Sequence, residues 1–302
     1  MGRFINPFTD IGFKRIFGQE FSKPLLIDFL NNLLSGEQVV TEVTFLDKER
    51  PSVFQDGRTI IYDIYCQTSS GDHIIVEMQN KLERNFKERT LFYAAEAIVR
   101  QGERGNKWQY NINAVYLVSF INDHKDTFSE DFRTDVMLLD KKHHQVFCDK
   151  LHFIYLQLPL FSSEVDDCNT DFDRWIYVLK HMETLTRLPW SAQNAVFKKL
   201  EEISELRALT REERLYYDAA LREYRDHLYI LEGEKEKGRE EGRAEGRAEG
   251  REEGRAEGLA EGEKKAAARI VCHMKRAGKS IDEMVTMTGF SVEEIKSLLE
   301  ED

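Results

Sequence analysis

Residues 59–79 read TIIYDIYCQTSSGDHIIVEMQ, and this stretch predicts a β-hairpin. Two runs rich in β-branched and aromatic residues, 59–68 and 73–79, flank Ser69-Ser70-Gly71, which is typical of a tight turn. Successive strand residues point to opposite faces, so the alternate apolar positions predict a core face made of Ile60, Ile64, Cys66, Ile74, Val76 and Met78. The opposite face carries Asp63, Glu77 and Gln79.

The turn decides which residues of the hairpin lie across from each other. If it is a three-residue loop with Gly71 in the left-handed conformation, Asp63 lies directly opposite Glu77. Their β-carbons would then be roughly 4.5–5.5 Å apart, and two like charges at that spacing destabilise a sheet. A divalent cation bound by hard oxygen ligands removes this repulsion. The hairpin therefore predicts a Mg²⁺ or Mn²⁺ site.

The competing interpretation is that both carboxylates lie on a solvent-facing side of the sheet and have no function. Ile61, Tyr65 and Ile75 share that face, however, which predicts that a second layer of the protein covers it. A carboxylate buried in such a layer is costly without a partner. We therefore favour the metal-binding interpretation.

Apolar periodicity on both sides of the hairpin predicts an αβββαβ order over residues 8–121. Helices are expected at 10–17, 22–34 and 81–103, and strands at 41–46, 59–68, 73–79 and 113–121. Additional short strands are expected at 136–139, 145–148 and 153–158. This order indicates a mixed α/β fold in which helices cover a mixed (α+β) sheet.

From residue 172 onward the pattern becomes helical, with helices expected at 172–185, 191–207 and 211–231. Glycine then recurs at every fourth position from 238 to 262, with Arg or Lys and Glu between. In the last segment, two capping-box patterns predict three helices, at 264–277, 281–288 and 292–301. We predict four parts: a domain at 1–160, a helical appendix at 161–231, a low-complexity repeat at 232–263 and a small helix-turn-helix-like unit at 264–302.

The repeat has two interpretations. On an α-helix its Arg and Glu positions form stripes on nearly opposite sides, so ion pairs within one helix are few, and its seven glycines cost roughly 6–7 kcal/mol relative to alanine. Stripes of opposite charge on two copies suggest a homo-oligomer through 232–263. A charged, largely disordered spacer is the alternative. The last helix is acidic, which favours an interaction role over base reading for 264–302.

Composition narrows the class of protein. The chain has 302 residues, with 55 acidic and 43 basic side chains for a net charge of −12. Four widely spaced cysteines and the lack of a long apolar run predict a reduced, cytoplasmic protein without a zinc site or membrane anchor. The acidic total argues against nonspecific binding to nucleic acid, but residues 1–120 hold 14 basic and 15 acidic side chains, so a DNA-facing surface is expected there.

Several separated segments together resemble a known family. The αβββαβ order with Asp63 on the second strand and Glu77-Met78-Gln79 on the third resembles the PD-(D/E)XK nuclease fold, with Gln79 where that family usually has lysine. FINPFTDIGFKRIFG (4–18), YDIYCQT (62–68), IIVEMQ (74–79) and ERTLFYAA (88–95) are more narrowly similar to the Rpn family of recombination-promoting nucleases, also described as transposases. The resemblance covers residues 1–160 and, more loosely, the helices that follow.

The resemblance implies Mg²⁺-dependent (or Mn²⁺-dependent) cleavage of phosphodiester bonds in DNA. By position, Asp63 and Glu77 are the implied metal ligands, with the backbone carbonyl of Met78 as an additional oxygen, and Gln79 orients the attacking water or the phosphate. Asp10 is a further candidate ligand, because the family often has an acidic group on the first helix. It is equally an ordinary first-turn residue that pairs with Lys14.

An amide at position 79 brings no positive charge and transfers no proton near neutral pH, so we expect modest turnover or a compensating cation elsewhere. Segment 81–107 has seven basic and four acidic side chains, which favours a DNA-facing helix. Arg89 and Tyr93 lie one turn apart and are expected to contact phosphate and sugar or base. The remaining candidates for DNA contact are Lys81, Arg84 and Lys87. The alternative is a solvated helix face with Tyr93 in the core.

Together these features predict a divalent-metal-dependent DNA endonuclease linked to recombination or mobile elements. The alternative is a non-catalytic scaffold or DNA-associated binding protein that retains the nuclease fold and assembles through its tail. Cleavage assays on variants of the two hairpin carboxylates separate these hypotheses.

Overall fold

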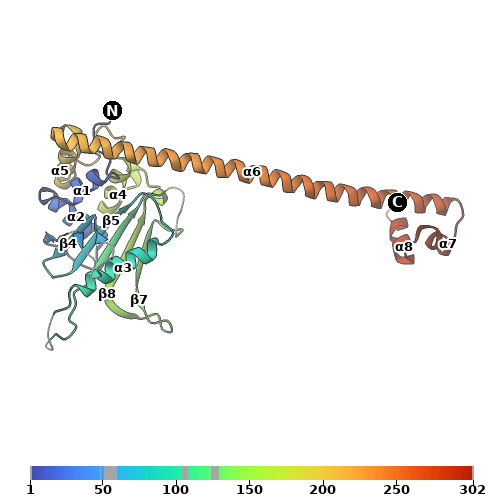
Figure 1. Cartoon of the computed structure of the whole chain (residues 1–302), viewed down its shortest axis with the longest axis horizontal. Helices are drawn as coiled ribbons and strands as arrows, with labels where there is room; N and C mark the ends of the chain where they lie inside the picture. The colour runs from blue at the N-terminus through green and yellow to red at the C-terminus, as the bar shows by residue number, and fades with distance from the viewer. Residues whose placement is uncertain (1, 48, 51–59, 104–107, 124–128, 301–302) are drawn as a thin grey trace. The chain divides into compact units, whose positions relative to one another are not determined.

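The computed structural model describes residues 2–47, 49–50, 60–103, 108–123 and 129–300, which form two compact units (Figure 1). The first unit is Met1–Tyr229 and the second is Ile230–Asp302. The boundary between them falls within helix α6 (Arg211–Arg276). In the described part of the chain, no helix combines the length and the apolar character needed to cross a bilayer.

A six-stranded mixed sheet forms the centre of the first unit, in the order β1-β4-β5-β6-β8-β7. Its strands are β1 (Val43–Phe45), β4 (Ile64–Thr68), β5 (His73–Gln79), β6 (Val115–Ile121), β7 (Arg133–Leu139) and β8 (Val146–Gln157). Strands β5, β6 and β8 run parallel to one another, and the other pairs are antiparallel. Strands β2 (Glu49–Arg50) and β3 (Ile60–Ile61) form a separate two-stranded sheet.

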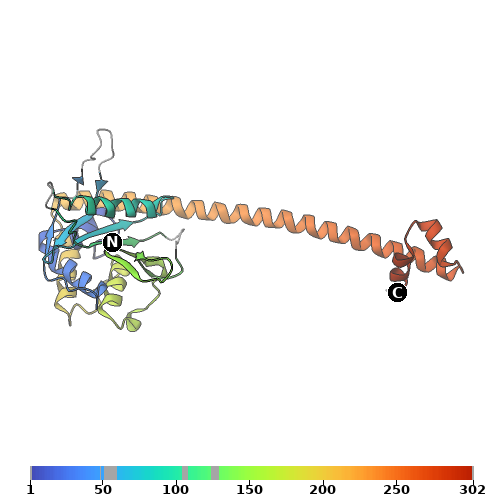
Figure 2. The same cartoon turned by 90° about the horizontal axis from the view of Figure 1, so that it is seen from below.

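Helices cover both faces of the large sheet (Figure 2). Helix α3 (Phe86–Val99) packs on one face, over Tyr65 and Ile75, so the prediction that this face is covered is confirmed. The other face is covered by α1 (Asp10–Phe17), α2 (Lys23–Leu33), α4 (Asp171–His181) and α5 (Ala195–Ser204). Short 3₁₀ helices lie at Glu20–Ser22, Leu158–Leu160, Val165–Asp167 and Leu206–Ala208.

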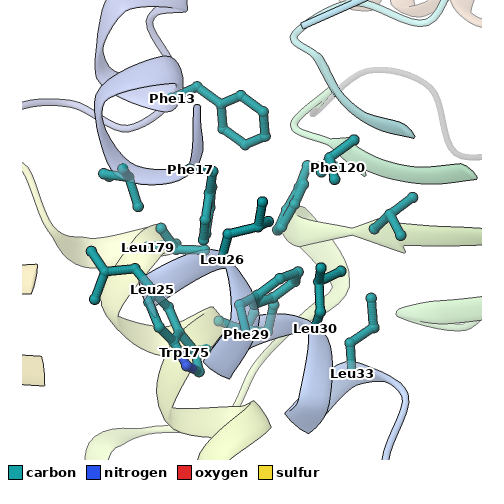
Figure 3. Close-up of a cluster of buried hydrophobic side chains, with 14 of the residues drawn as sticks. Phe13, Phe17, Leu25, Leu26, Phe29, Leu30, Leu33, Phe120, Trp175 and Leu179 are labelled. Carbon is teal, nitrogen blue, oxygen red and sulfur yellow. The ribbon is translucent and has the colours of Figure 1, made fainter. Parts of the chain in front are cut away.

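The larger core lies between the sheet and helices α1, α2 and α4, and aromatic rings fill its centre (Figure 3). The ring of Phe120 on β6 lies 5.2 Å from that of Phe29 and 6.1 Å from that of Phe17. Trp175 on α4 is fully buried, 5.7 Å from the ring of Phe17. Because Trp175 belongs to this core, the helices that follow residue 160 pack into the same compact unit as the sheet.

The αβββαβ order is confirmed, but several expected elements have different bounds, and the helices predicted at 211–231 and 264–277 are parts of one helix, α6. The strand predicted at 59–68 is interrupted at Tyr62 and Asp63, and the strands predicted at 145–148 and 153–158 are one strand, β8. The helix predicted at 81–103 begins only at Phe86 and ends at Val99. Its start is delayed because the Leu82 N–H donates to Asp123 Oδ2 over 2.7 Å, which holds the preceding residues in an irregular connection.

The second unit contains the rest of α6, α7 (Ile281–Thr288) and α8 (Val292–Glu300) around a small core. Both predicted capping boxes are present. Ser280 and Glu283 exchange side-chain-to-backbone hydrogen bonds at the start of α7, and Ser291 and Glu294 do the same before α8. These caps place the two short helices at the bounds expected from the sequence, within one or two residues.

Helix α6 is continuous through the glycine repeat. As the stripe geometry predicts, the repeat arginines at 243, 247, 251 and 255 form no ion pair with any glutamate that the structure describes. No atom beyond the neighbouring helix backbone lies within 4 Å of the β-carbon positions of the glycines from Gly238 to Gly262. None of the described residues outside the helix therefore packs on the glycine row, and self-association through 232–263 stays a prediction.

Candidate active site

The register of the hairpin brings Asp63 and Glu77 together. Strands β4 and β5 pair Ile64 with Val76, and Gly71 has a φ of 93° in the connecting turn, as a three-residue loop requires. Asp63 comes directly before Ile64, and Glu77 directly after Val76. The two acidic residues therefore occupy the next position of the predicted pairing.

The backbone leaves the regular ladder at this position. In a continued ladder the Met78 N–H would donate to the carbonyl of Tyr62, but it donates to Asp63 Oδ2 over 2.8 Å instead. In the other direction, the Asp63 N–H donates to Glu77 Oε1 over 3.2 Å. Each carboxylate is thus held by a backbone N–H of the neighbouring strand, and this reciprocal pair interrupts the strand predicted at 59–68.

Glu77 is the buried member of the pair, with 5% of its surface exposed. Burial raises the pKa of Glu77 well above its usual range, and the Asp63 carboxylate raises it further. The Asp63 N–H and the positive charges of Arg89 and Lys14 act in the opposite direction on this pKa. An ionised Glu77 lacks solvation and lies beside a like charge, so a bound cation would relieve both costs.

Arg89 on α3 reaches the end of β5, as predicted. One guanidinium nitrogen donates to Gln79 Oε1, and the other donates to Glu83 Oε2 over 2.9 Å. The guanidinium is therefore fixed between the two side chains, and its charge acts on Glu77. The positive charge of Arg89 therefore lies next to the Gln79 amide, at the position where the family that the chain resembles usually has lysine.

Tyr93 packs against Tyr62. Strict alternation along an unbroken strand would place Tyr62 on the face of Ile64, but the bend at Asp63 turns it to the α3 side, where it is fully buried. Its ring meets that of Tyr93 edge to face at 5.5 Å, and its hydroxyl donates to the Tyr93 carbonyl over 3.2 Å. Ile61, expected on the covered face, is 56% exposed instead.

The other predicted DNA contacts lie near the start of α3. Lys81 and Arg84 are exposed on the connection between β5 and α3, and Lys87 is exposed on the first turn of the helix. Lys87 also lines a cavity between α3, β7 and β8, on the side of the helix away from Gln79. Arg104 and Lys107, which contribute to the predicted basic excess, lie outside the described residues.

Asp10 has the contacts of an ordinary first-turn residue, which was one of the two interpretations of the sequence. Its carboxylate pairs with Lys14 Nζ at 2.5 Å, and Thr9 caps the helix by accepting the Gly12 N–H. Lys14 is close enough to lower the pKa of Glu77, so this ion pair borders the candidate site. A role for Asp10 in metal binding stays a prediction.

The donor set fits a small, hard divalent cation. Among the described residues, no three or more His, Cys, Asp or Glu side chains form a cluster that could hold a metal ion, so Asp63 and Glu77 stand as a pair. Mg²⁺ is commonly bound through one or two carboxylates plus waters and substrate phosphates. Two oxygen-donating side chains, one of them desolvated, match that requirement. The carbonyl of Met78 as a further ligand stays a prediction.

Two asparagines at this edge of the sheet were not singled out from the sequence. Asn80 follows β5, and Asn122 follows β6, the parallel neighbour of β5. The signal was present, because polar residues directly after buried parallel strands meet at one edge of the sheet, where α/β proteins place functional groups. Lys14 lacked such a signal, since its approach to Glu77 depends on long-range packing.

The family model described as PD-(D/E)XK nuclease family transposase matches residues 7–234. This span includes the hairpin, α3 and the helices as far as the first part of α6. Neither a curated protein nor a solved structure is significantly similar to the chain.

Proposed function

Because this chain belongs to the PD-(D/E)XK nuclease family transposases, we propose that it is a divalent-metal-dependent endonuclease that hydrolyses phosphodiester bonds in DNA. The observation that carries this proposal is the reciprocal pairing of Asp63 and Glu77 at the edge of the sheet. Family membership supports nuclease chemistry, and the two carboxylates supply a place for it on this chain.

Asp63 and Glu77 would hold Mg²⁺ or Mn²⁺. When bound, such an ion lowers the pKa of a water ligand and offsets negative charge on the phosphate. The protein prepares this position in advance, because backbone N–H groups fix both carboxylates before any ligand arrives. Fixing the acidic groups beforehand reduces the reorganisation needed during the reaction.

Gln79 and Arg89 would act on the phosphate side of the site. Arg89 occupies the Gln79 amide oxygen, which leaves the amide N–H₂ group to donate to a phosphate oxygen or to the attacking water. The guanidinium carries the positive charge that an amide lacks and presents it at the same place. We therefore assign to Arg89 the compensating cation that the glutamine at position 79 calls for.

DNA would approach along the exposed basic residues beside the site. Lys81 and Arg84 are accessible on the connection that leads from Gln79 into α3. Contacts from such residues to phosphates position a duplex without reading its sequence. The description of the family as transposases supports a role in recombination or in the movement of DNA elements.

Plasmid nicking tests the proposal. Wild-type protein, Asp63→Ala and Glu77→Ala are incubated with supercoiled DNA and Mg²⁺ or Mn²⁺, with excess EDTA as the metal-free arm. We expect each substitution to slow nicking at least about a hundredfold, because each removes a charged metal ligand. Glu88→Ala is the matched control, since Glu88 is an exposed acidic residue on α3.

Wild-type rates in both carboxylate variants would remove the proposed site. If wild-type protein cleaves neither supercoiled, linear nor single-stranded DNA with either metal, the non-catalytic scaffold becomes the better explanation of the fold.

A further inference from the structure

Strands β5 and β6 end side by side, and an asparagine follows each of them. The backbone N–H of Asn122 donates to the carbonyl of Gln79 over 2.8 Å, so the residue after β6 is bonded to the last residue of β5. Asn122 is 5% exposed. A buried amide in this position needs hydrogen-bond partners, and those partners connect it to other elements.

Asn80 joins the end of β5 to the start of α1. Its Nδ2 donates to the carbonyl of Phe8 over 2.8 Å. Phe8 directly precedes Thr9, the N-cap of α1, and that helix carries Lys14, whose charge acts on Glu77. Asn80 therefore fixes Gln79 and the helix that bears Lys14 relative to each other.

Asn122 joins this arrangement to α6. Its Nδ2 donates to Asn80 Oδ1 over 3.3 Å and to the hydroxyl of Tyr224 over 3.0 Å. The side chain of Asn6 lies close enough to act on the pKa of Tyr224, and it donates to Glu183 Oε2 over 2.6 Å. A chain of hydrogen bonds thus runs from Tyr224 on α6 through Asn122 and Asn80. It reaches the end of β5 and the start of α1, near the carboxylate pair.

We infer that Asn80, Asn122 and Tyr224 are positioning residues of the nuclease site, an inference that rests on the proposed function. They act through the Gln79 backbone and through the start of α1. The first part of α6 is then required for turnover as well as for stability. Helices that follow residue 160 become part of the working enzyme.

Tyr224→Phe is the most direct test, because it removes one hydroxyl and keeps the ring. In the full chain with Mg²⁺, we expect kcat for nicking to fall about tenfold with KM for DNA changed less than about twofold, because geometry at the site is lost while the DNA-binding surface is unaltered. Tyr216→Phe is the matched control, since Tyr216 lies on the same helix and is 61% exposed.

A double variant tests whether the residues act as one chain. If Tyr224 works through Asn80, Tyr224→Phe combined with Asn80→Ala should be about as slow as the slower single variant, instead of showing the product of the two losses. Independent, multiplicative losses would overturn the connection between the two residues.

Hydrogen exchange on the metal-free full chain gives a readout that does not depend on cleavage. We expect amides at 77–82 and 6–13 to exchange faster in Tyr224→Phe than in wild type or Tyr216→Phe, because the ends of β5 and α1 lose their anchor. Unchanged kcat overturns the inference. A fall in kcat that comes with lower global stability and unchanged exchange at 77–82 also overturns it, because the role of Tyr224 is then structural.

If wild-type protein cleaves no DNA, the proposed function fails and the exchange measurement decides the positioning role alone. Faster exchange at 77–82 in Tyr224→Phe then supports the chain of hydrogen bonds, and unchanged exchange overturns it.

Discussion

Glutamate occurs in two contrasting settings in this chain. Glu77 on β5 is almost completely buried beside Asp63, and burial raises its pKa well above the usual range. The repeat glutamates on α6, such as Glu249, are exposed to solvent. The same side chain is therefore a buried candidate metal ligand in one region and a solvated charge in the other. Burial and neighbouring charges, and not the number of charged residues, distinguish a carboxylate suited to chemistry from a solvated one.

Arginine also occurs in both settings, at the candidate site as Arg89 and on the exposed repeat as Arg247. Of the substitutions considered below, replacing Arg89 should have the largest effect. Arg89→Ala should slow nicking about ten- to a hundredfold, because it removes the charge beside Gln79 and Glu77. Arg247→Ala, on the exposed repeat, is the control and should leave the rate unchanged. Initial rates on supercoiled plasmid measure both. Equal losses in the two variants would contradict a specific role for the Arg89 charge at the site.

The buried glutamate should cost stability as well as support activity. In metal-free protein near pH 8, Glu77→Gln should raise the free energy of unfolding by about 1–3 kcal/mol, because it removes a desolvated charge beside Asp63. A carboxyl whose pKa is raised by folding destabilises the native state as pH rises above the ordinary pKa of 4.5, so the gain should disappear at or below that pH.

Chemical denaturation in EDTA across this pH range measures the effect. Glu249→Gln on the repeat is the control and should change nothing at any pH. A pH-independent gain for Glu77→Gln would show that its cause is packing, and the contrast between the two glutamates would lose its electrostatic basis.

Replacing glycine by alanine should change stability in opposite directions in the two regions. Gly250→Ala should stabilise α6 locally by about 0.8–1 kcal/mol, since no described atom outside the neighbouring helix backbone lies within 4 Å of the new β-carbon. Gly71→Ala should destabilise the first unit, because Gly71 has a φ of 93° and the added carbon would lie 2.8 Å from the Asn113 amide nitrogen. Hydrogen exchange over 238–262 and thermal melting measure the two effects. If hydrogen exchange over 238–262 is no slower in Gly250→Ala than in wild type, the repeat is not helical in solution.

The smallest effect concerns association of the repeat. Exposed ion pairs are worth only a few tenths of a kcal/mol each, so stripes of opposite charge would give weak pairing between copies. A peptide spanning 238–262 should become more helical as its concentration rises. Ellipticity that is independent of concentration would contradict a homo-oligomer built through this segment.

The hairpin could be predicted in detail because local rules govern it. Loop length fixed its register, and alternation placed Ile74 and Val76 in the core. Tyr62 escaped these rules, because a side chain took over a backbone hydrogen bond at Asp63 and reversed the face of the preceding residue. The late start of α3 has a similar cause, since the carboxylate that accepts the Leu82 N–H comes from Asp123, far away in the sequence.

The candidate site also has features that local sequence predicts and features that depend on long-range packing. The pairing of Asp63 with Glu77 and the approach of Arg89 to Gln79 follow from spacing within one hairpin and the helix after it. The approach of Lys14 and the bonds of Asn122 depend on how α1, β6 and α6 pack together, and no local pattern encodes that packing.

The turn at residues 69–71 has a consequence for how such a chain can change over generations. If the turn kept its three-residue form, one extra residue there would shift the pairing of β4 with β5 by one step, and Asp63 and Glu77 would no longer lie opposite each other, although both would still be present. Substitutions at Ser69 or Ser70 keep the number of residues in the loop, whereas an insertion or deletion keeps the register only if the turn changes its form. Sequence variants of this chain should therefore differ more often in the identity of the turn residues than in their number. The turn lies at the end of the hairpin remote from the carboxylates.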